Sequence, residues 1–264
     1  MSERIKKIFE TKEKKLVTFT TGGDPDLNTS LEVLKTIINN GIDIIEIGMP
    51  FSDPMADGPT IQESSVRSLA NGTKINDIFE LVINIRKSNN EIPIILMGYY
   101  NSIFNLGIDN FTAKCAKTGV DGLIIVDLQP EEDSELYTKS KEKDIDLIRL
   151  ITPTTDQKRL VTILNNASGF LYYVTVTGIT GQNSANIEEL KKSINTIRSS
   201  TKLPIVAGFG IKNRNDVEQI SSFTDGVVVG SSIVNIIKDN LNDKNKMINE
   251  IKVFTNDLKE GIKK

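Results

Sequence analysis

Three carboxylic acids lie close together between residues 46 and 57, and their surroundings differ. Glu46 occupies an apolar run, Ile42 to Ile47, where a carboxylate leaves water and needs either a partner or a proton. Asp53 and Asp57 follow in a loop that is stiffened by prolines. A buried acid followed by a stiff acidic loop is typical of a site where protons are transferred. The segment therefore predicts acid/base chemistry.

Each of these acids also has a plain structural interpretation. Glu46 could be paired with a buried basic residue, but Arg149 is the only such residue inside a predicted strand. Without a partner, burial should raise the pKa of Glu46 towards the range that suits an acid or base near neutral pH. We therefore favour catalysis for Glu46. Asp53 and Asp57 could instead cap a turn or the helix that follows them, and both interpretations stay open.

The chain contains no histidine, and this absence restricts its chemistry. Metal sites built on imidazole are excluded, as are Ser-His and Cys-His nucleophile pairs, and we expect no metal site. Protons must then move through Asp, Glu, Tyr, Lys or the one cysteine. That cysteine, Cys115, lies in an apolar helical pattern and is expected to be buried and inert.

The totals describe an ordinary globular chain. Of 264 residues, 38% are hydrophobic and 25% are charged, and the net charge of −3 provides no basic field for nucleic acid or an anionic membrane. No apolar run approaches the roughly 20 residues that span a bilayer. The amphipathic start is unlike a secretory signal, and a single cysteine excludes an internal disulfide and fits a reducing compartment. We expect a cytoplasmic protein.

Short β-rich runs alternate with segments of helical period. Most of the runs are continuously apolar, which is typical of parallel strands that are covered on both faces. Eight such strands over about 250 residues match the α/β class and the (β/α)8 TIM barrel. An open doubly wound sheet would show fewer strands and an early G-x-G-x-x-G turn, which is missing. The predicted strands are Leu16–Thr21, Asp43–Gly48, Pro93–Gly98, Gly122–Asp127, Asp146–Ile151, Leu171–Thr175, Pro204–Gly208 and Gly226–Gly230.

We predict a single TIM-barrel domain over residues 1–264, with an extra helix within residues 1–13. No linker rich in Ser and Gly divides the chain. The next helix is expected to start with a capping box that begins at Thr29. The connections at Gly98–Leu106 and Thr175–Asn186 are longer than a plain connection requires, which favours a lid or binding role.

Two glycine-rich strand ends predict an anion site. The seventh strand ends in Ala207-Gly208-Phe209-Gly210, and the eighth ends in Val229-Gly230-Ser231-Ser232 ahead of an apolar helix. Glycines let the backbone approach an anion closely, and a helix N-terminus adds unpaired N–H groups and a positive dipole. Each motif alone could be a tight turn with a capping serine. Because TIM barrels often hold phosphate in these two loops, we predict a phosphate site.

The stretch from Asp43 to Gln62 resembles the signature segment of the tryptophan synthase α chain family. The resemblance is long and specific, and it extends across nearly the whole chain. Further motifs that support it are Gly23-Asp24-Pro25, Met97-Gly-Tyr-Tyr-Asn101, Gly178-Ile-Thr-Gly181, Gly208-Phe-Gly210 and Gly230-Ser231.

The resemblance implies a lyase that cleaves indole-3-glycerol phosphate to indole and D-glyceraldehyde 3-phosphate in tryptophan biosynthesis, with no cofactor in this chain. It also implies that Glu46 is the general acid/base, that Asp57 engages the indole N–H, and that Tyr172 lies near the scissile bond. The phosphate-binding positions fall on Gly181, Gly210, Gly230 and Ser231. The indole-pocket positions fall on Phe19, Met97, Tyr99, Ile124, Val126, Leu150, Thr180 and Phe209.

The chemistry of this retro-aldol reaction suits two acids in unlike environments. The indole ring is a poor leaving group until its C3 is protonated, and that proton places positive charge on the ring nitrogen. The neighbouring hydroxyl must lose its proton as the aldehyde forms. Glu46 and Asp57 can divide these tasks, and the reaction needs no metal.

The resemblance further implies a partner, a β chain that holds pyridoxal phosphate and receives the indole, in an α2β2 heterotetramer. The partner-contact and loop-closure positions fall on Pro50, Asp53, Asn101, Phe104 and Asn105. Asp53 and Thr180 match a pair that closes the site, which would couple the two chains.

Two positions depart from the family pattern: Val176 stands where many members carry Arg, and Gln129 stands where a proline is common. Other phosphate-binding barrels fit less well, because metal-dependent epimerases need His ligands and indole-glycerol-phosphate synthases need inward lysines. A non-catalytic protein that binds ligand and only activates a β chain is the alternative function. The presence of both Glu46 and Asp57 argues against it.

Overall fold

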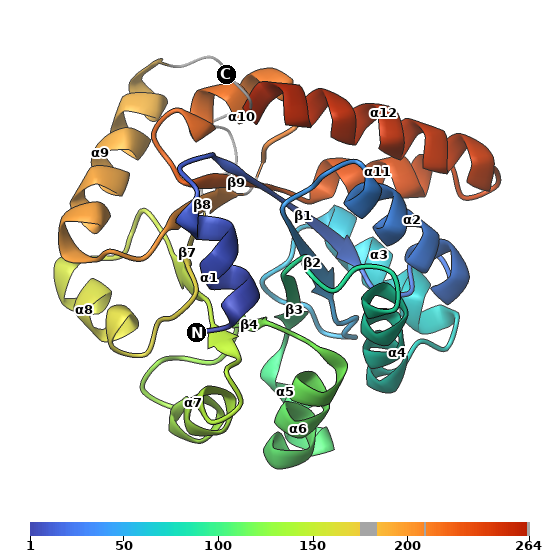
Figure 1. The fold of residues 1–264 in the computed structure, drawn as a ribbon, viewed down its shortest axis with the longest axis horizontal. Helices are drawn as coiled ribbons and strands as arrows, with labels where there is room; N and C mark the ends of the chain where they lie inside the picture. Colours follow the sequence, from blue (N-terminus) through green and yellow to red (C-terminus); the bar gives the residue numbers. More distant parts are fainter. Residues whose placement is uncertain (175–183, 209, 263–264) are drawn as a thin grey trace.

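The computed structural model of the protein describes residues 1–174, 184–208 and 210–262. Its strands are parallel and form one sheet in the order β5-β4-β3-β2-β1-β9-β8-β7-β6. The strands at the two ends of this order are consecutive in the chain, so the sheet curls into a nearly closed barrel (Figure 1). The predicted TIM barrel is confirmed. The strands are β1 (Lys15–Thr21), β2 (Ile44–Gly48), β3 (Ile94–Gly98), β4 (Gly122–Ile125), β5 (Asp146–Leu147), β6 (Arg149–Ile151), β7 (Leu171–Val174), β8 (Ile205–Gly208) and β9 (Gly226–Val229).

The fifth predicted strand, Asp146–Ile151, is divided in the structure. Its first half, β5, pairs with β4, and its second half, β6, pairs with β7. Between them, Ile148 donates its N–H to the carbonyl of Leu123 at 3.0 Å. The prediction of one continuous strand was therefore wrong. The barrel closes at this point, and each half of the run faces a different neighbour.

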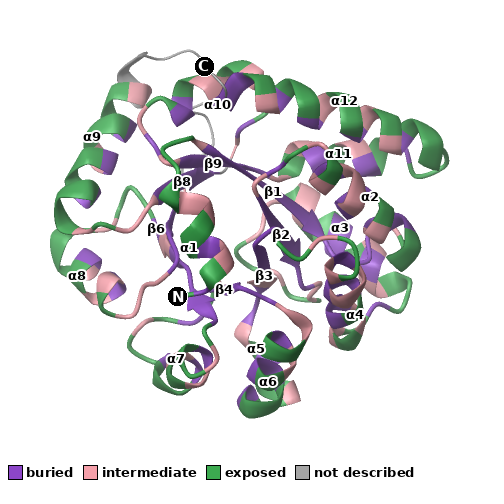
Figure 2. Ribbon diagram, in the orientation of Figure 1, coloured by how far each residue is buried: buried purple, intermediate pink, exposed green. Residues whose placement is uncertain are grey.

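Helices cover the outside of the barrel, with their buried faces turned towards the sheet (Figure 2). The apolar residues of each helix recur at helical period, which places them on one face. None of the helices in the described part of the chain combines the length and apolar character needed to cross a bilayer. They are α1 (Glu3–Glu10), α2 (Leu27–Asn39), α3 (Pro59–Ala70), α4 (Ile75–Arg86), α5 (Tyr100–Leu106), α6 (Ile108–Thr118), α7 (Ser134–Lys141), α8 (Gln157–Asn165), α9 (Ser184–Ser200), α10 (Arg214–Ser221), α11 (Ser231–Asp239) and α12 (Lys244–Ile262).

The side chains of each strand alternate between the barrel interior and the layer beneath the helices. In β2, Ile45 and Ile47 belong to the outer core, whereas Ile44 belongs to a separate apolar cluster inside the barrel. Glu46 lies two residues after Ile44 and therefore points into the barrel. Because of this alternation, the carboxyl group of Glu46 lies inside the barrel.

Helix α1 closes the end of the barrel where the strands begin (Figure 1). Its Ile5 has no exposed surface and joins the interior cluster, and the ring of Phe9 lies 5.7 Å from that of Phe170. Arg4 pairs at 3.1 Å with Asp121, which precedes β4. The predicted N-terminal helix is confirmed. It leaves the opposite end, where the strands finish, as the open mouth of the barrel.

Two local features differ from the sequence-based expectation. Helix α2 begins at Leu27, and its N-cap is Asp26, whose carboxylate accepts hydrogen bonds from the N–H groups of Asn28 and Thr29 at 2.9 and 3.0 Å. The predicted capping box at Thr29 was wrong because the helix already begins at Leu27, where Asp26 accepts the first free N–H groups. The long connection after β3 contains a short helix, α5.

The buried basic residues of the described chain do not neutralise Glu46. Arg149 points to the outside of the barrel, where it pairs with Asp133 beside α7. The ammonium of Lys15, at the start of β1, donates to the Thr11 hydroxyl at 2.6 Å. Neither side chain bonds to Glu46, so both arrangements are structural.

Candidate active site

A cavity of about 240 Å³ lies at the mouth of the barrel, opposite α1. Strand ends and the loops that follow them contribute its walls, which is where TIM-barrel proteins place their chemistry. Its lining residues are Phe19, Glu46, Ala56, Asp57, Gly58, Ile61, Met97, Val126, Leu150, Thr152, Tyr172, Val174, Gly210, Ile211, Val228, Gly230 and Ser231.

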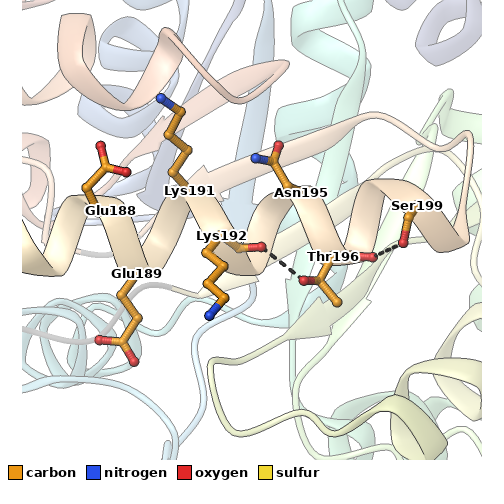
Figure 3. Close-up of a pocket in the computed structure, with 7 residues that line it drawn as sticks. All are labelled: Glu188, Glu189, Lys191, Lys192, Asn195, Thr196 and Ser199. Carbon is orange, nitrogen blue, oxygen red and sulfur yellow. Dashed lines mark hydrogen bonds between the residues drawn. The ribbon is translucent and has the colours of Figure 1, made fainter.

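A second hollow, drawn in Figure 3, lies on the outer face of α9 and is a weaker candidate. All of its lining residues come from that one helix, and its acids and lysines point to different sides (Figure 3). Thr196 and Ser199 bond to carbonyls of the same helix, at 3.0 and 2.7 Å. Because no polar groups from different elements converge there, we place the active site in the barrel mouth.

Glu46 is the one carboxyl group on the wall of this cavity that is completely buried. It has no exposed surface, and neither of its oxygens has a hydrogen-bond partner within the described part of the chain. Burial raises the pKa of Glu46 to about 8. A carboxyl group in this state is protonated near neutral pH and can act first as an acid and then as a base.

Tyr172 points into the cavity from β7. A Cβ atom on Gly208 of the neighbouring strand would lie 2.4 Å from the Tyr172 hydroxyl, so only glycine leaves room for the phenol. Burial, reinforced by the charge of Glu46, raises the pKa of Tyr172 well above its usual value. The phenol is therefore neutral and serves as a hydrogen-bond donor or acceptor, not as a base.

Asp57 reaches the cavity from the loop between β2 and α3, and Tyr99 holds it there. The Tyr99 hydroxyl donates to Asp57 Oδ2 at 3.0 Å and accepts from the N–H of Ala56 at 3.0 Å. Phe51 stacks on the Tyr99 ring at 5.1 Å. Burial raises the pKa of Asp57, and the hydrogen bond from Tyr99 opposes that rise. Asp57 is thus a positioned carboxylate that is less buried than Glu46.

Another part of the cavity wall combines two features that suit an anion. Gly210 has φ of +79°, a backbone conformation that favours glycine. Gly230 is the N-cap of α11, and Ser231 is the first residue of that helix. The first N–H groups of a helix have no partner inside it, and the helix dipole is positive at this end. A phosphate group fits both features.

Ten of the residues singled out in the sequence line the cavity, namely Phe19, Glu46, Asp57, Met97, Val126, Leu150, Tyr172, Gly210, Gly230 and Ser231. Tyr99 lies behind Asp57, and Ile124 lies deeper in the interior cluster. Thr180, Gly181 and Phe209 fall outside the described residues, as does Val176. Gln129 lies on another depression, beside Arg159.

Sequence reasoning missed several apolar or small residues of the wall. Val174 and Val228 could have been found from the period of two, because each lies two residues from a predicted position on its strand. Ala56, Gly58, Ile61, Thr152 and Ile211 carry no comparable signal, since only the folded loops bring them to the cavity. No group of three or more acidic or cysteine side chains in the described chain could hold a metal ion.

The partner-contact positions lie on the surface around the mouth. Asp53, Asn101 and Asn105 are exposed, and Pro50 is partly exposed. Phe104 exposes 67% of its surface, and Met55 in the β2–α3 loop exposes 82%. Large apolar side chains that are this exposed beside an active site favour a protein interface.

The chain matches known proteins over nearly its full length. A family model described as "Tryptophan synthase alpha chain" matches residues 5–263. The chain belongs to this family. The tryptophan synthase alpha chain of Petrotoga mobilis is 44% identical over 256 residues, which cover 97% of this chain and 98% of that relative.

Solved structures support the same membership. The tryptophan synthase subunit alpha of Legionella pneumophila has a TM-score of 0.92 and 34% identity, over 100% of this chain and 99% of that chain. A chain of Mycobacterium tuberculosis tryptophan synthase has a TM-score of 0.87 and 28% identity, over 99% of each chain. A tryptophan synthase alpha chain is a carbon–carbon lyase, and its reaction converts indole-3-glycerol phosphate to indole and glyceraldehyde 3-phosphate in tryptophan biosynthesis.

Proposed function

We propose that Glu46, Asp57 and Tyr172 are the catalytic residues of this cleavage. The substrate phosphate would bind at Gly210, Gly230 and Ser231, where a helix N-terminus meets a glycine turn. The indole ring would occupy the apolar side of the cavity, which Phe19, Met97, Val126 and Leu150 line. From the sequence alone, Gly181 would join the phosphate site, and Tyr99, Ile124, Thr180 and Phe209 the indole pocket.

The reaction begins with proton transfer from neutral Glu46 to C3 of the indole ring. Positive charge then appears on the ring nitrogen, where the Asp57 carboxylate stabilises it. Glu46, now a carboxylate, removes the proton from the neighbouring hydroxyl. The bond between C3 and the side chain breaks, its electron pair returns to the ring, and indole and the aldehyde form. Tyr172, a neutral phenol, holds the reacting hydroxyl by a hydrogen bond.

One observation carries this assignment: a fully buried carboxyl group without a hydrogen-bond partner among the described residues faces the cavity, with a pKa of about 8. Burying such a group is costly, and a purely structural carboxyl would be paired. Strongly perturbed ionisable groups in cavities are enriched in catalytic residues.

Release of indole from indole-3-glycerol phosphate by the wild type and by Glu46→Gln tests the assignment. Loss of general acid/base catalysis should lower kcat about 100-fold or more. Glu80→Gln is the matched control, because Glu80 is exposed on α4 and should leave kcat unchanged. Equal rates in wild type and Glu46→Gln would remove Glu46 from the mechanism.

We further propose a β chain as partner, with pyridoxal phosphate bound in that chain and an α2β2 stoichiometry, in the cytoplasm. The whole chain would act as one domain. The exposed Phe104 and Met55, with Pro50, Asp53, Asn101 and Asn105 around them, support a contact at the barrel mouth. Phe104→Asp should weaken the association with a β chain in sedimentation, whereas Val253→Asp, at a similarly exposed position on α12, should not.

A further inference from the structure

A small recess continues the active-site cavity past Asp57. It measures about 10 Å³, which is close to the volume that one water molecule requires. Its shared wall with the main cavity consists of Phe19, Asp57, Ile61, Met97 and Val126. Beyond that wall it is lined by Thr21, Gly48, Met49, Ser65, Gly98 and Tyr99, and we call this space the ring recess.

The ring recess has one hydroxyl that is free to bind a ligand. The Thr21 hydroxyl is bonded to Ser64 at 2.5 Å, and the Tyr99 hydroxyl is used by Asp57. Ser65 also lines the recess and is only 4% exposed, and its hydroxyl is not bonded to another described residue. A hydroxyl that opens on the recess without a protein partner can form a hydrogen bond with a small polar group there.

We propose that the ring recess admits indole-3-glycerol phosphate that carries a hydroxyl at ring position 7, and that Ser65 recognises this hydroxyl. The proposal rests on the proposed function, in which Asp57 binds the indole N–H. The substituent at C7 leaves the ring on the same edge as the N–H. C2 and C7 flank this N–H, and C2 is bonded to C3, which carries the chain towards the phosphate site. We therefore place C7 on the side of Asp57 away from that site, at the ring recess, which none of Gly210, Gly230 and Ser231 lines.

Size and polarity both favour a hydroxyl in this position. A hydroxyl can accept a hydrogen bond from Ser65 and donate one to Asp57. Fluorine has a similar size, but it donates no hydrogen bond and its partial negative charge faces a carboxylate. A methyl group is larger than the single water-sized group that the recess accepts, and it cannot bond to the Ser65 hydroxyl.

The test compares kcat/KM for four substrates: the parent and its 7-hydroxy, 7-fluoro and 7-methyl derivatives, with the full-length chain and a β chain. We expect the 7-hydroxy substrate to exceed the 7-fluoro substrate about three- to tenfold, since one hydrogen bond is at stake. The 7-methyl substrate should fall at least about tenfold below the 7-fluoro substrate. The parent substrate reports separately on the proposed function.

Ser65→Ala should abolish the preference for 7-hydroxy over 7-fluoro while the 7-methyl substrate stays poor. The matched control is Ser68→Ala, one turn along α3, because the Ser68 hydroxyl is buried but donates to the carbonyl of Gly22 at 2.7 Å. That variant should keep the hydroxy-to-fluoro ratio. The proposal is overturned if the parent is cleaved and either the 7-methyl substrate matches the 7-hydroxy one or Ser65→Ala leaves the ratio unchanged.

Discussion

Replacing Glu46 by Gln should make the protein gain stability relative to the wild type as the pH rises from about 5 to 8, although it removes the main catalytic group. The wild-type carboxyl has a pKa of about 8 in the folded state, against 4.5 when exposed. Between these two values the folded state keeps a proton that the unfolded state releases. Glu46 therefore lowers the free energy of unfolding by a growing amount as the pH rises from about 4.5 to 8. Outside this pH range its contribution stays constant.

The magnitude follows from the size of the pKa shift. Each pH unit within the window removes about 1.4 kcal/mol from the free energy of unfolding. At pH 7 the ionisation of Glu46 in the unfolded chain thus costs roughly 3 kcal/mol, relative to a group that does not titrate. The amide that replaces the carboxyl in Glu46→Gln does not titrate, so its own burial cost shifts the whole curve without changing its slope.

Urea denaturation of the wild type and Glu46→Gln at half-unit steps from pH 5 to pH 8 measures this difference. The other acids titrate alike in both proteins, so they cancel in the difference between the two free energies of unfolding. We expect this difference to rise in favour of Glu46→Gln by about 1.4 kcal/mol per pH unit. A difference that stays constant with pH would refute the burial argument, because Glu46 would then have an ordinary pKa in the folded protein.

Three further predictions concern the same site and the loop beside it. The kcat/KM for indole release should fall above about pH 8 as Glu46 loses the proton that it must donate, and a rate that keeps rising with pH to 9.5 would contradict its role as the acid. Tyr99→Phe removes the hydrogen bond to Asp57 and should lower kcat/KM about two- to tenfold, whereas an unchanged value would mean that the loop backbone alone positions Asp57. Gly23→Ala should destabilise the protein by about 2 kcal/mol more than Gly41→Ala in thermal or urea unfolding, because both have φ of +78° but only at Gly23 would a Cβ meet other atoms, at 2.3 Å. Equal losses in the two variants would show that the loop at Gly23 relaxes around the added methyl group.

The elements that the sequence predicted best are those with a strong local signal. The apolar runs of β2, β3 and β9 were placed to within a residue or two, because continuous burial on both faces demands continuous apolar character. The division of the run Asp146–Ile151 had no such signal. It arises from ring closure, which depends on strands far apart in the chain.

The same distinction applies to the candidate site. Glu46 could be singled out because a carboxyl group in a buried strand conflicts with its apolar neighbours, and the sequence alone shows this conflict. Tyr99 could only be assigned to a general pocket. Its contact with Asp57, 42 residues earlier in the chain, exists because the ends of β2 and β3 are neighbours in the barrel.

By itself, the sequence determined the class of fold, the absence of imidazole chemistry, the buried acid and the family whose signature surrounds it. These properties depend on amino-acid composition, on the spacing of apolar residues and on short motifs, and all three can be taken from the sequence without knowing the fold. Only the tertiary structure decided that Arg149 pairs with Asp133, that Tyr99 holds Asp57, and that Ser65 lines a recess of about 10 Å³ next to Asp57. Each of these depends on which side chains from distant segments share a space, and the closed barrel sets those distances.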